Sequence, residues 1–485
     1  MQFTPALESN MRHGNSLITL CLMVVLAILL AACESREQTD AVSYSPVGPV
    51  PAAPQRPGDP RKGYEALLNA PYITCGIPDS AYKQTASPPR ASSLIPGRSG
   101  RNAELPYALT AYTTPQGVEL VVNNCLSCHA GFFDGKLVIG LGNENLDFTE
   151  DYAAAAESAG AYVEDEAEAA EWRRWADRIR AMAPHMITDT VGANPAINTT
   201  LVLMAHRDPK TLAWSQEPLI ELPSKTVAPV SVPPWWRMAK KNALFYNTEG
   251  RGDLARAMMV GAILCADDVN TVKRIDAYAP DIHAYLASIK PPPWPFRLDP
   301  KLAEQGRAVF ERTCSGCHGT YGEHPSYPNL VLGLNEIGTD PVLAQNAAGG
   351  ASDRFIRWFN RSYYGELARA APAPGYIAPP LDGIWITAPY LHNGSVPTVE
   401  ALLDSSKRSK YWTRSYESSA ADYDPVGLGW RYTGLAQGKA GASDSKARKK
   451  IYDTTLPGHS NAGHVFGDSL NAEERKAVLE YLKTL

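Results

Sequence analysis

Methionine is absent from the C-terminal part of the sequence. The chain has 485 residues, and all nine of its methionines lie at or before Met259. No thioether ligand for a metal is therefore available beyond that position. Cysteine is also scarce, with eight residues in the whole chain, which excludes a disulfide-dense scaffold.

The sequence also has no large excess of positive or negative charge. Lys and Arg number 46 against 51 Asp and Glu, for a formal net charge of -5. Nucleic-acid binders carry strongly basic faces, so the composition argues against a nucleic-acid partner. Glycine and proline are plentiful, at 37 and 39 residues, which predicts many loops and excludes a coiled coil or an idealised bundle.

The one long apolar run, residues 17–32, carries no charge. It is shorter than the roughly 20 residues that a membrane-spanning helix needs, but it suits the core of a signal peptide. Residues 30–33 read LAAC and resemble the bacterial lipobox, so we expect a lipoprotein signal peptide over 1–32 and a lipid on Cys33. A plain N-terminal anchor with an incidental cysteine is the alternative.

Residues 33–61 are rich in proline and small polar residues and predict a flexible tether. Glu34 follows the expected lipid cysteine and is not the aspartate that favours the inner membrane of enteric bacteria. We therefore expect a body that faces the periplasm and is anchored by lipid to the outer membrane.

Two copies of a C-x-x-C-H motif lie in the chain, at residues 125–129 (CLSCH) and 314–318 (CSGCH). This spacing is typical of covalent haem attachment. The two thiols add to the haem vinyl groups, and the following histidine supplies the proximal nitrogen to iron. A thioredoxin-like redox pair and one zinc site with four thiolates are the alternatives. The pattern predicts two haem c groups, held by Cys125, Cys128 and His129 and by Cys314, Cys317 and His318.

Cys75 and Cys265 remain after the signal, lipid and haem cysteines are set aside. In an oxidising compartment a remaining pair predicts a disulfide. It closes a loop of about 190 residues that spans most of the first haem region. Two free buried thiols are the alternative.

The two motifs are 189 positions apart, which leaves room for one haem domain each. The segment 290–296 (KPPPWPF) lies between them and breaks regular structure, because proline restricts itself and its predecessor. We therefore predict a mainly α protein of two cytochrome c-like haem domains with long loops, an N-terminal one over 62–296 and a C-terminal one over 297–485.

Four segments predict helices around these motifs. Asp299 and Pro300 are typical of a helix start, so a helix over 302–314 leads into the second motif. A helix over 281–288 precedes the proline-rich segment, residues 152–182 are strongly helical in composition, and the last helix begins near Asn471.

The missing methionines restrict the sixth ligand of the C-terminal haem. The ligand is histidine, another donor or none, and the candidates are His324, His392, His459 and His464. For the first haem, six methionines and three histidines (His185, His206 and His283) lie between the first motif and the proline-rich segment, and the sequence does not choose among them.

Residues 381–399 (LDGIWITAPYLHNGSVPTV) resemble the segment that marks the bacterial dihaem cytochrome c peroxidase superfamily. That superfamily includes the enzyme that matures the tryptophan tryptophylquinone cofactor and the dihaem rubber oxygenases. Residues 100–107 (GRNAELPY), 247–256 (NTEGRGDLAR) and 463–467 (GHVFG) place the resemblance nearest the rubber oxygenase branch. It covers the chain from about residue 62 to its end.

The resemblance implies roles for further residues. His464 falls at the sixth-ligand position of the C-terminal haem, and Trp235 and Trp236 fall where the family has a tryptophan between its haems. For this pair, core packing is the alternative to an electron relay. The resemblance leaves the first iron open to a small ligand, does not make His392 a ligand, and is the sole basis for expecting calcium.

Arg251 and Arg256 are candidates for holding haem propionates, because a guanidinium pairs with carboxylates in a bidentate fork. Surface positions are the alternative for both. Two function classes follow. One is a haem-dependent oxidoreductase that meets peroxide or dioxygen at one haem; the other is a non-catalytic electron carrier. Either requires a redox partner protein or a small-molecule electron donor or acceptor.

Overall fold

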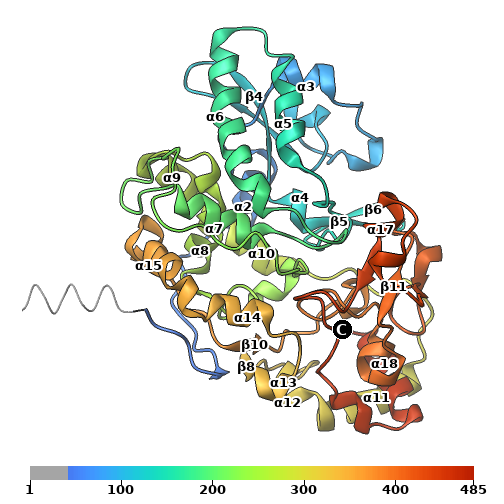
Figure 1. Ribbon diagram of the computed structural model, residues 1–485. Coiled ribbons are helices and arrows are strands. Elements are labelled where there is room, and N and C mark those ends of the chain that lie inside the picture. The colour runs from blue at the N-terminus through green and yellow to red at the C-terminus, as the bar shows by residue number, and fades with distance from the viewer. Residues whose placement is uncertain (1–41) are drawn as a thin grey trace, which may run out of the picture. The chain divides into compact units, whose positions relative to one another are not determined.

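Short strands lie between the helices along residues 42–485, the part of the chain that our computed structural model describes (Figure 1). Helices account for 41% and strands for 12% of the structure, so the protein is mixed α/β. The predicted mainly α fold of two cytochrome c-like domains is wrong. The physical reason lies in the loops: buried backbone amides and carbonyls need partners, and here they pair into small sheets.

Residues 1–41, with the predicted signal peptide and Cys33, lie outside the described part. Seventeen α-helices follow in chain order in the described part: α2 (Pro60–Asn69), α3 (Asp79–Thr85), α4 (Leu126–His129), α5 (Tyr152–Gly160), α6 (Glu166–Met182), α7 (Ala196–Ala205), α8 (Leu254–Met258), α9 (Val269–Asp276), α10 (Ala279–Ser288), α11 (Pro300–Thr313), α12 (Ser315–His318), α13 (Leu334–Ile337), α14 (Val342–Ala347), α15 (Asp353–Arg361), α16 (Val399–Leu403), α17 (Ser445–Arg448) and α18 (Ala472–Leu482). Within residues 42–485 no helix is both long enough and apolar enough to cross a membrane.

The strands are two to five residues long: β1 (Gly48–Pro49), β2 (Ile77–Pro78), β3 (Leu109–Thr113), β4 (Glu119–Asn123), β5 (Ala130–Phe133), β6 (Lys136–Ile139), β7 (Gly250–Gly252), β8 (Leu330–Gly333), β9 (Ala368–Ala370), β10 (Gly375–Ile377), β11 (Tyr411–Thr413), β12 (Tyr423–Asp424), β13 (Gly429–Trp430), β14 (Thr433–Gly434) and β15 (Ile451–Asp453). They form three-stranded sheets in the orders β1-β8-β10, β2-β4-β3 and β14-β11-β15, and the pairs β5-β6, β7-β9 and β12-β13. All of these pairings are antiparallel.

Three of the four predicted helices form where they were expected. Asp299 caps α11 by accepting from the amides of Lys301 and Leu302, and α10 precedes the proline-rich segment. Asn471 and Glu474 form a capping box at the start of α18. The predicted helix over 152–182 is instead two helices, because Asp165 caps a new start at α6.

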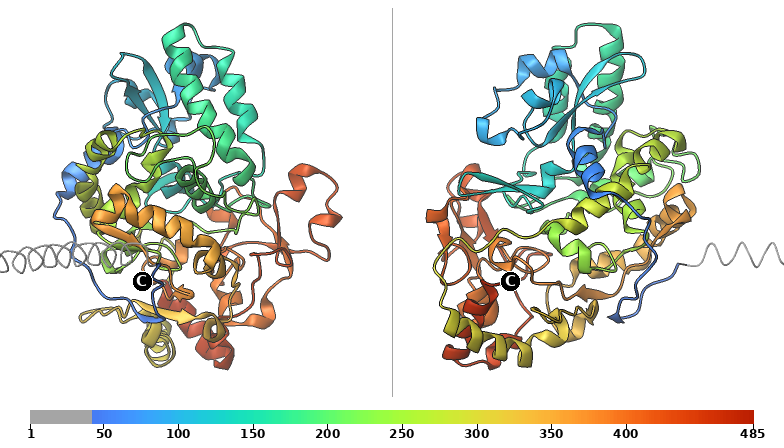
Figure 2. Two further views of the ribbon diagram at one scale, coloured as in Figure 1. Left: turned by 60° about the vertical axis from the view of Figure 1, so that its left-hand side comes forward. Right: turned by 180° about the vertical axis from the view of Figure 1, so that it is seen from behind.

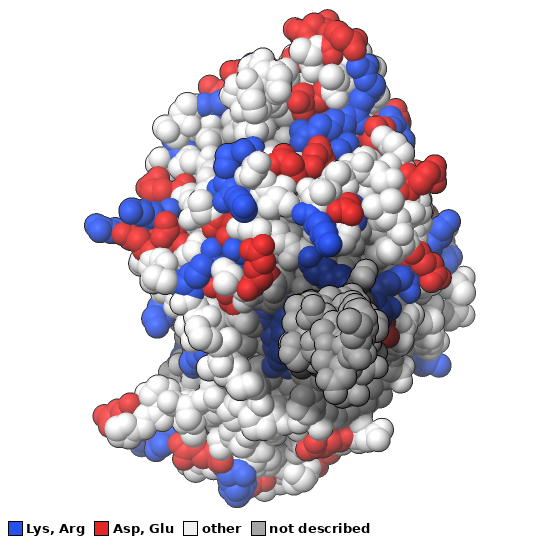
Figure 3. All heavy atoms as spheres, turned by 90° about the vertical axis from the view of Figure 1, so that its left-hand side faces the viewer, with Lys and Arg blue, Asp and Glu red and all other residues white. Residues whose placement is uncertain are grey.

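Helices α11 and α18 lie together at one end of the molecule, and α5 and α6 lie with β4 at the opposite end (Figures 1 and 2). Gly306 of α11 permits the first contact, because a Cβ there would meet the carbonyl oxygen of Ala477 at 1.9 Å. On the face shown in Figure 3, acidic and basic side chains are interspersed.

The hydrophobic core crosses the predicted boundary between residues 296 and 297. One cluster joins Phe133, Leu141 and Trp236 to Phe310 and Trp385. Tyr44–Leu485 accordingly form one compact unit. The regions around the two motifs therefore share buried apolar surface.

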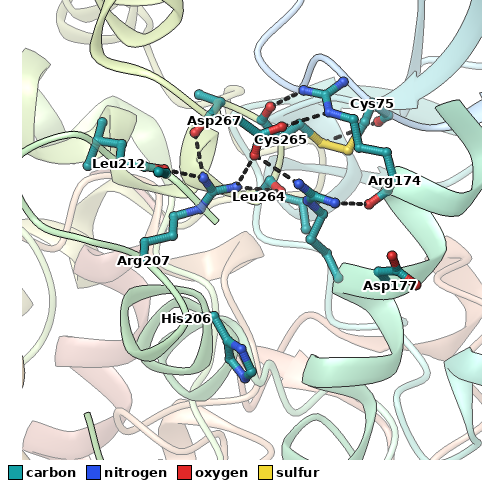
Figure 4. Close-up of polar contacts among 12 residues, drawn as sticks. Cys75, Arg174, Asp177, His206, Arg207, Leu212, Leu264, Cys265 and Asp267 are labelled. Carbon is teal, nitrogen blue, oxygen red and sulfur yellow. Dashed lines mark hydrogen bonds and ion pairs between the residues drawn. A yellow bond between two sulfur atoms is a disulfide. The ribbon is translucent and has the colours of Figure 1, made fainter. Parts of the chain in front are cut away.

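Cys75 and Cys265 form a disulfide with a Cα–Cα distance of 5.3 Å, over a sequence separation of 190. Asp267 lies beside this bond and pairs with Arg174 and Arg207 from either side (Figure 4). Arg207 is fully buried, and it also donates to the carbonyl of Leu212. The disulfide and the ion pairs together join the strand region to the segment before α9.

The described part of the predicted tether, residues 44–61, is bound to the body and is not a free linker. β1 pairs with β8 at the edge of a sheet. Arg56 donates to both carboxylate oxygens of Asp253 and of Asp276, at 2.8 to 3.1 Å. The backbone amide of Asp59 donates to Asp281 at 2.7 Å. The composition predicted a free segment, but long-range pairing holds it.

Replacing Arg56 by alanine should release this segment. Both acidic partners are nearly buried, at 5% and 4% exposure, so the variant leaves Asp253 without its charged partner and Asp276 with Arg256 alone. We expect a loss of about 2 kcal/mol in the free energy of unfolding and new proteolytic cleavage within residues 44–58. Arg61→Ala, an exposed arginine of the same segment, is the matched control. Identical digestion patterns for both variants would show that Arg56 does not hold the segment.

Candidate haem-binding site

The second C-x-x-C-H motif lies on α12, directly after α11. Gly319 ends this turn with a φ of 81°, and a Cβ there would meet the carbonyl oxygen of Ser326 at 2.0 Å. Nδ1 of His318 is 2.8 Å from the carbonyl oxygen of Pro379. Because a carbonyl only accepts, Nδ1 carries the proton, and Nε2 is left unprotonated as a metal ligand needs.

A large apolar cavity faces this motif. Its empty space, open mouth included, is about 1420 Å³. Cys314, Cys317 and His318 line one part of the wall, and His464 also lines it. Most other lining side chains are apolar, and among them are Phe310, Leu332, Ile337, Tyr376, Leu381, Ile384, Tyr390, Leu402 and Phe466. Two thiols beside a histidine in an apolar cavity are the donor set that haem c requires.

His464 and His318 lie 146 residues apart in sequence, yet their ring centroids are 6.1 Å apart. An imidazole nitrogen lies about 2 Å from a metal that it binds, so two imidazoles on opposite sides of one metal atom have ring centroids roughly 6 Å apart. The observed spacing therefore fits two axial imidazoles. Burial lowers the pKa of His464 to about 4, which keeps its imidazole neutral.

The loop that carries His464 is held in an unusual backbone conformation. His464 has a φ of 45°, and Gly463 before it has a φ of 74°. A Cβ on Gly463 would meet the backbone carbon of Gly338 at 2.1 Å, so only glycine fits there. Arg408 donates to the carbonyls of Gly463 and His464, at 2.7 and 3.1 Å. A left-handed non-glycine residue is costly and persists where the surroundings demand it.

The first motif lies on α4 and runs into the β5-β6 hairpin. The His129 ring stacks on the Trp235 ring with centroids 4.8 Å apart and planes 19° apart. Burial lowers the pKa of His129 to about 4 and raises the pKa of Cys125 to about 12. Among residues 42–485, no second imidazole lies in ring contact with His129. His318 has an imidazole neighbour, His464, so the two motif histidines differ in their surroundings.

Trp235 and Trp236 lie between the first motif and the cavity at the second. Both are buried, at 7% and 4% exposure, and the residues on either side of them, Pro234 and Arg237, line the cavity. Nε1 of Trp236 donates to the carbonyl of Asp382 at 2.8 Å. The neighbouring Leu381 also lines the cavity. Stacked rings and hydrogen bonds thus connect His129 to the wall of the cavity at His318.

A family model described as RoxA-like, cytochrome c-like matches residues 375–413. This segment relates the chain to the RoxA-like cytochromes c. It supplies Tyr376, Leu381 and Leu402 to the cavity wall. The match indicates a haem-containing redox protein that binds iron through haem c.

Two curated proteins of Sinorhizobium fredii (strain NBRC 101917 / NGR234) are similar to the chain, and both are described as uncharacterized. The protein y4iJ is 33% identical over 266 residues, and y4iM is 30% identical over 237 residues. Each comparison covers 41% of this chain, and 42% and 52% of the two relatives. The chain thus spans about half the length of the curated relatives that it matches.

The other candidate histidines of the C-terminal part of the chain make no ring contact with His318 in residues 42–485. His324 is exposed. His392 lines the cavity, but its ring stacks on Tyr376 with centroids 4.0 Å apart. His459 is buried and lies 2.9 Å from the carbonyl of Pro457. In the described chain, only His464 makes a ring contact with His318.

The three candidate histidines of the N-terminal part lie in other surroundings. His206 stacks on Trp214 with centroids 4.9 Å apart. His185 is 3.4 Å from the carbonyl of Ser224, and Nε2 of His283 is buried without a partner in the described chain. None of the three makes a ring contact with His129 in residues 42–485.

The two arginines predicted to hold propionates do not line the large cavity. Arg251 donates to Thr248, and Arg256 pairs with Asp276 at 3.1 Å. Arg237 lines the cavity instead and is 7% exposed. Arg237 therefore fits a propionate of a haem in this cavity. In the sequence, the position of Arg237 directly after Trp235 and Trp236 is the feature that points to a role at the haem site.

Glu144 is a second residue that the sequence analysis missed. Its carboxylate accepts from the hydroxyl of Ser231 at 2.7 Å, and Ser231 lines the cavity with Tyr246 and His392. Burial raises the pKa of Glu144 to about 7, against the opposing effects of Ser231 and Arg414. No group of three or more His, Cys, Asp or Glu side chains able to hold a metal ion occurs in residues 42–485, so the implied calcium finds no such cluster there.

The buried Glu144 carboxyl should make the stability of the protein depend on pH. Its pKa rises from 4.5 in the unfolded chain to about 7 in the folded chain, so folding favours the protonated form. The contribution of Glu144 to stability is therefore fully present below about pH 4.5 and is lost as the pH rises through about 7. Glu144→Gln cannot ionise and still accepts from Ser231. We expect it to stabilise the protein by roughly 1–3 kcal/mol at pH 8 and hardly at all at pH 4.

Urea unfolding at the two pH values measures this difference. Glu217→Gln, at an exposed glutamate, is the matched control and should leave the pH profile unchanged. A profile of Glu144→Gln that runs parallel to that of the wild type would contradict the assignment.

Proposed function

We propose that the chain is an exported dihaem c-type cytochrome that acts as a haem-dependent oxidoreductase. One observation carries the proposal: His318 has a second imidazole at the spacing of a shared metal, and His129 has none within ring contact in the described chain. Bound haem c supplies one-electron chemistry at each motif. In this proposal, the centre at His318 is closed to small ligands and the centre at His129 is open to them.

The closed centre is the one at His318. His318 and His464 would both hold the haem iron there, which would leave a small ligand no place to bind. Two imidazoles without methionine favour a comparatively low potential. The carbonyl of Pro379 orients His318, and Arg408 holds the loop of His464, so neither ring has to move when an electron is stored or passed on.

The open centre is the one at His129, which would hold a haem that supplies the binding site for peroxide or dioxygen. Trp235 stacks directly on His129, and Trp236 reaches the Asp382 carbonyl at the other cavity. These two tryptophans form the relay between the centres. Arg237, buried at the cavity wall, holds a propionate and so fixes the orientation of the group there.

The relation to the rubber oxygenase branch and the wider dihaem peroxidase superfamily, drawn from motifs such as residues 381–399, belongs to the same proposal. So does the lipid on Cys33, with a body anchored to the outer membrane and facing the periplasm. A redox partner protein or a small molecule exchanges electrons with the closed centre. The membrane contact is made through the lipid.

Removal of either cysteine pair should halve the haem content. Cys125→Ala/Cys128→Ala and Cys314→Ala/Cys317→Ala each remove one set of thioether bonds. The pyridine haemochrome assay on purified protein then gives two haems per chain for the wild type and one for each variant. The disulfide cysteines are unchanged in both variants and serve as an internal control for folding. A wild-type value of one haem per chain would refute two centres.

His464→Ala should open the closed centre. The wild type is expected to bind one CO per two haems after reduction, because one iron already has two protein ligands. The variant should bind two CO per chain and convert one haem from low to high spin, as seen by optical and electron paramagnetic resonance spectra. His392→Ala and His459→Ala are the matched controls and keep the wild-type spectrum.

Other outcomes of the CO titration separate the two function classes. No CO bound by the reduced wild type would mean that both irons are closed, and the protein would then be an electron carrier. An unchanged spectrum of His464→Ala would reject His464 as the ligand.

A further inference from the structure

Two adjoining cavities lie beside α7 and α15, apart from the cavity at His318. Their empty volumes, open mouths included, are about 670 and 540 Å³. Both are lined by Ile197, Leu201, Glu249 and Phe355. The two spaces therefore share one wall, and a ligand in the first lies next to the second.

The first of these cavities is mostly apolar. Its wall comes from α7, α15 and the segment around α8, and it includes Leu201, Met204, Val260, Phe355 and Phe359. Such a wall suits an alkyl chain, since each methylene group removed from water contributes about 0.8 kcal/mol. The second cavity is more polar and is lined by Asn194, Asn198, Asn247 and Asn346.

A positive charge lies at the rim of the apolar cavity. Arg369 lines the cavity and is exposed, and the β7-β9 pairing sets it directly opposite Arg251. Neither arginine forms an ion pair with a carboxylate in residues 42–485, and the guanidinium of Arg251 donates only to Thr248. Burial and the charge of Arg369 together lower the pKa of Arg251 to about 10. The rim thus has uncompensated positive charge.

One wall residue of the second cavity, Asn194, also lies beside Cys128 of the first haem motif. A molecule with its carboxylate at Arg369 has its other end in the apolar cavity, next to the space that Asn194 lines. A simple hydrocarbon would leave Arg369 without a carboxylate partner, whereas a molecule with one carboxylate at the end of an alkyl chain satisfies both ends.

We propose that these cavities bind an amphipathic carboxylate of the fatty-acid class. The carboxylate pairs with Arg369, and the alkyl chain lies among Leu201, Met204 and Phe355. The site goes beyond the proposed oxidoreductase function and does not depend on it, since binding requires neither an oxidant nor an open iron.

Glu249 allows a second test of how charge affects carboxylate binding, with the opposite expected result. It lies on the shared wall, where its carboxyl accepts one hydrogen bond, from Asn247 at 3.4 Å. Burial raises the pKa of Glu249. Whenever this carboxyl is ionised, it repels a bound carboxylate, so its replacement by glutamine should strengthen carboxylate binding, whereas loss of Arg369 should weaken it.

Calorimetric titration of the haem-loaded protein with decanoate and 1-decanol tests the site. The wild type should bind both ligands. Arg369→Gln should weaken decanoate binding by about five- to tenfold and leave 1-decanol binding unchanged, because a partly exposed charge-assisted contact is lost. Glu249→Gln should strengthen decanoate binding alone. Arg90→Gln, at an exposed arginine that lines neither cavity, is the matched control and should change nothing.

A cavity-filling variant tests where the ligand lies. Thr200 is half-buried on the wall of the apolar cavity, and Thr200→Phe should abolish binding of both ligands. Its melting temperature and its CO stoichiometry should match the wild type, which separates a blocked cavity from a misfolded protein. Absence of decanoate binding by the wild type, equal loss of both ligands in Arg369→Gln, or full binding by Thr200→Phe would each overturn the proposal.

Discussion

The approach of His464 to His318 is the constraint on which the C-terminal half of the structure depends. The two imidazoles are far apart in sequence, and their rings have to meet across an apolar cavity with one nitrogen of each ring unprotonated. This requires Gly463 against Gly338, a left-handed backbone at His464 and the guanidinium of Arg408 on the carbonyls of the loop. The left-handed backbone at His464 costs free energy, and the hydrogen bonds from Arg408 and the burial of the apolar wall offset this cost.

The tryptophan pair shows how packing and function coincide. Trp236 belongs to the hydrophobic cluster that includes Phe310 and Trp385, and its indole also donates to Asp382. Trp235 stacks on His129. The alternatives of core packing and electron relay therefore do not exclude each other. The two motif regions share one core, and this core brings the rings of His129, Trp235 and Trp236 next to one another.

Arginine holds the outer parts of this molecule together. Arg56 binds two buried carboxylates and fastens residues 44–61 to the body. Arg174 and Arg207 share Asp267 beside the disulfide. In each case a planar guanidinium meets carboxylates in a bidentate or branched arrangement, which a lysine does not reproduce. Arg369, in contrast, has no carboxylate partner in residues 42–485. It lies at the mouth of an apolar cavity, where it can bind a carboxylate ligand.

The sequence by itself determined the features that depend on short spacing. Each C-x-x-C-H motif places its thiols and imidazole within one turn, Asp299 and Asn471 cap the helices that follow them, and the absence of methionine left histidine as the available strong ligand. Only the tertiary structure decided that His464 approaches His318, that Arg237 and not Arg251 lines the cavity, and that loops pair into small sheets. Those outcomes depend on which distant segments share buried surface, and local spacing carries no information about that.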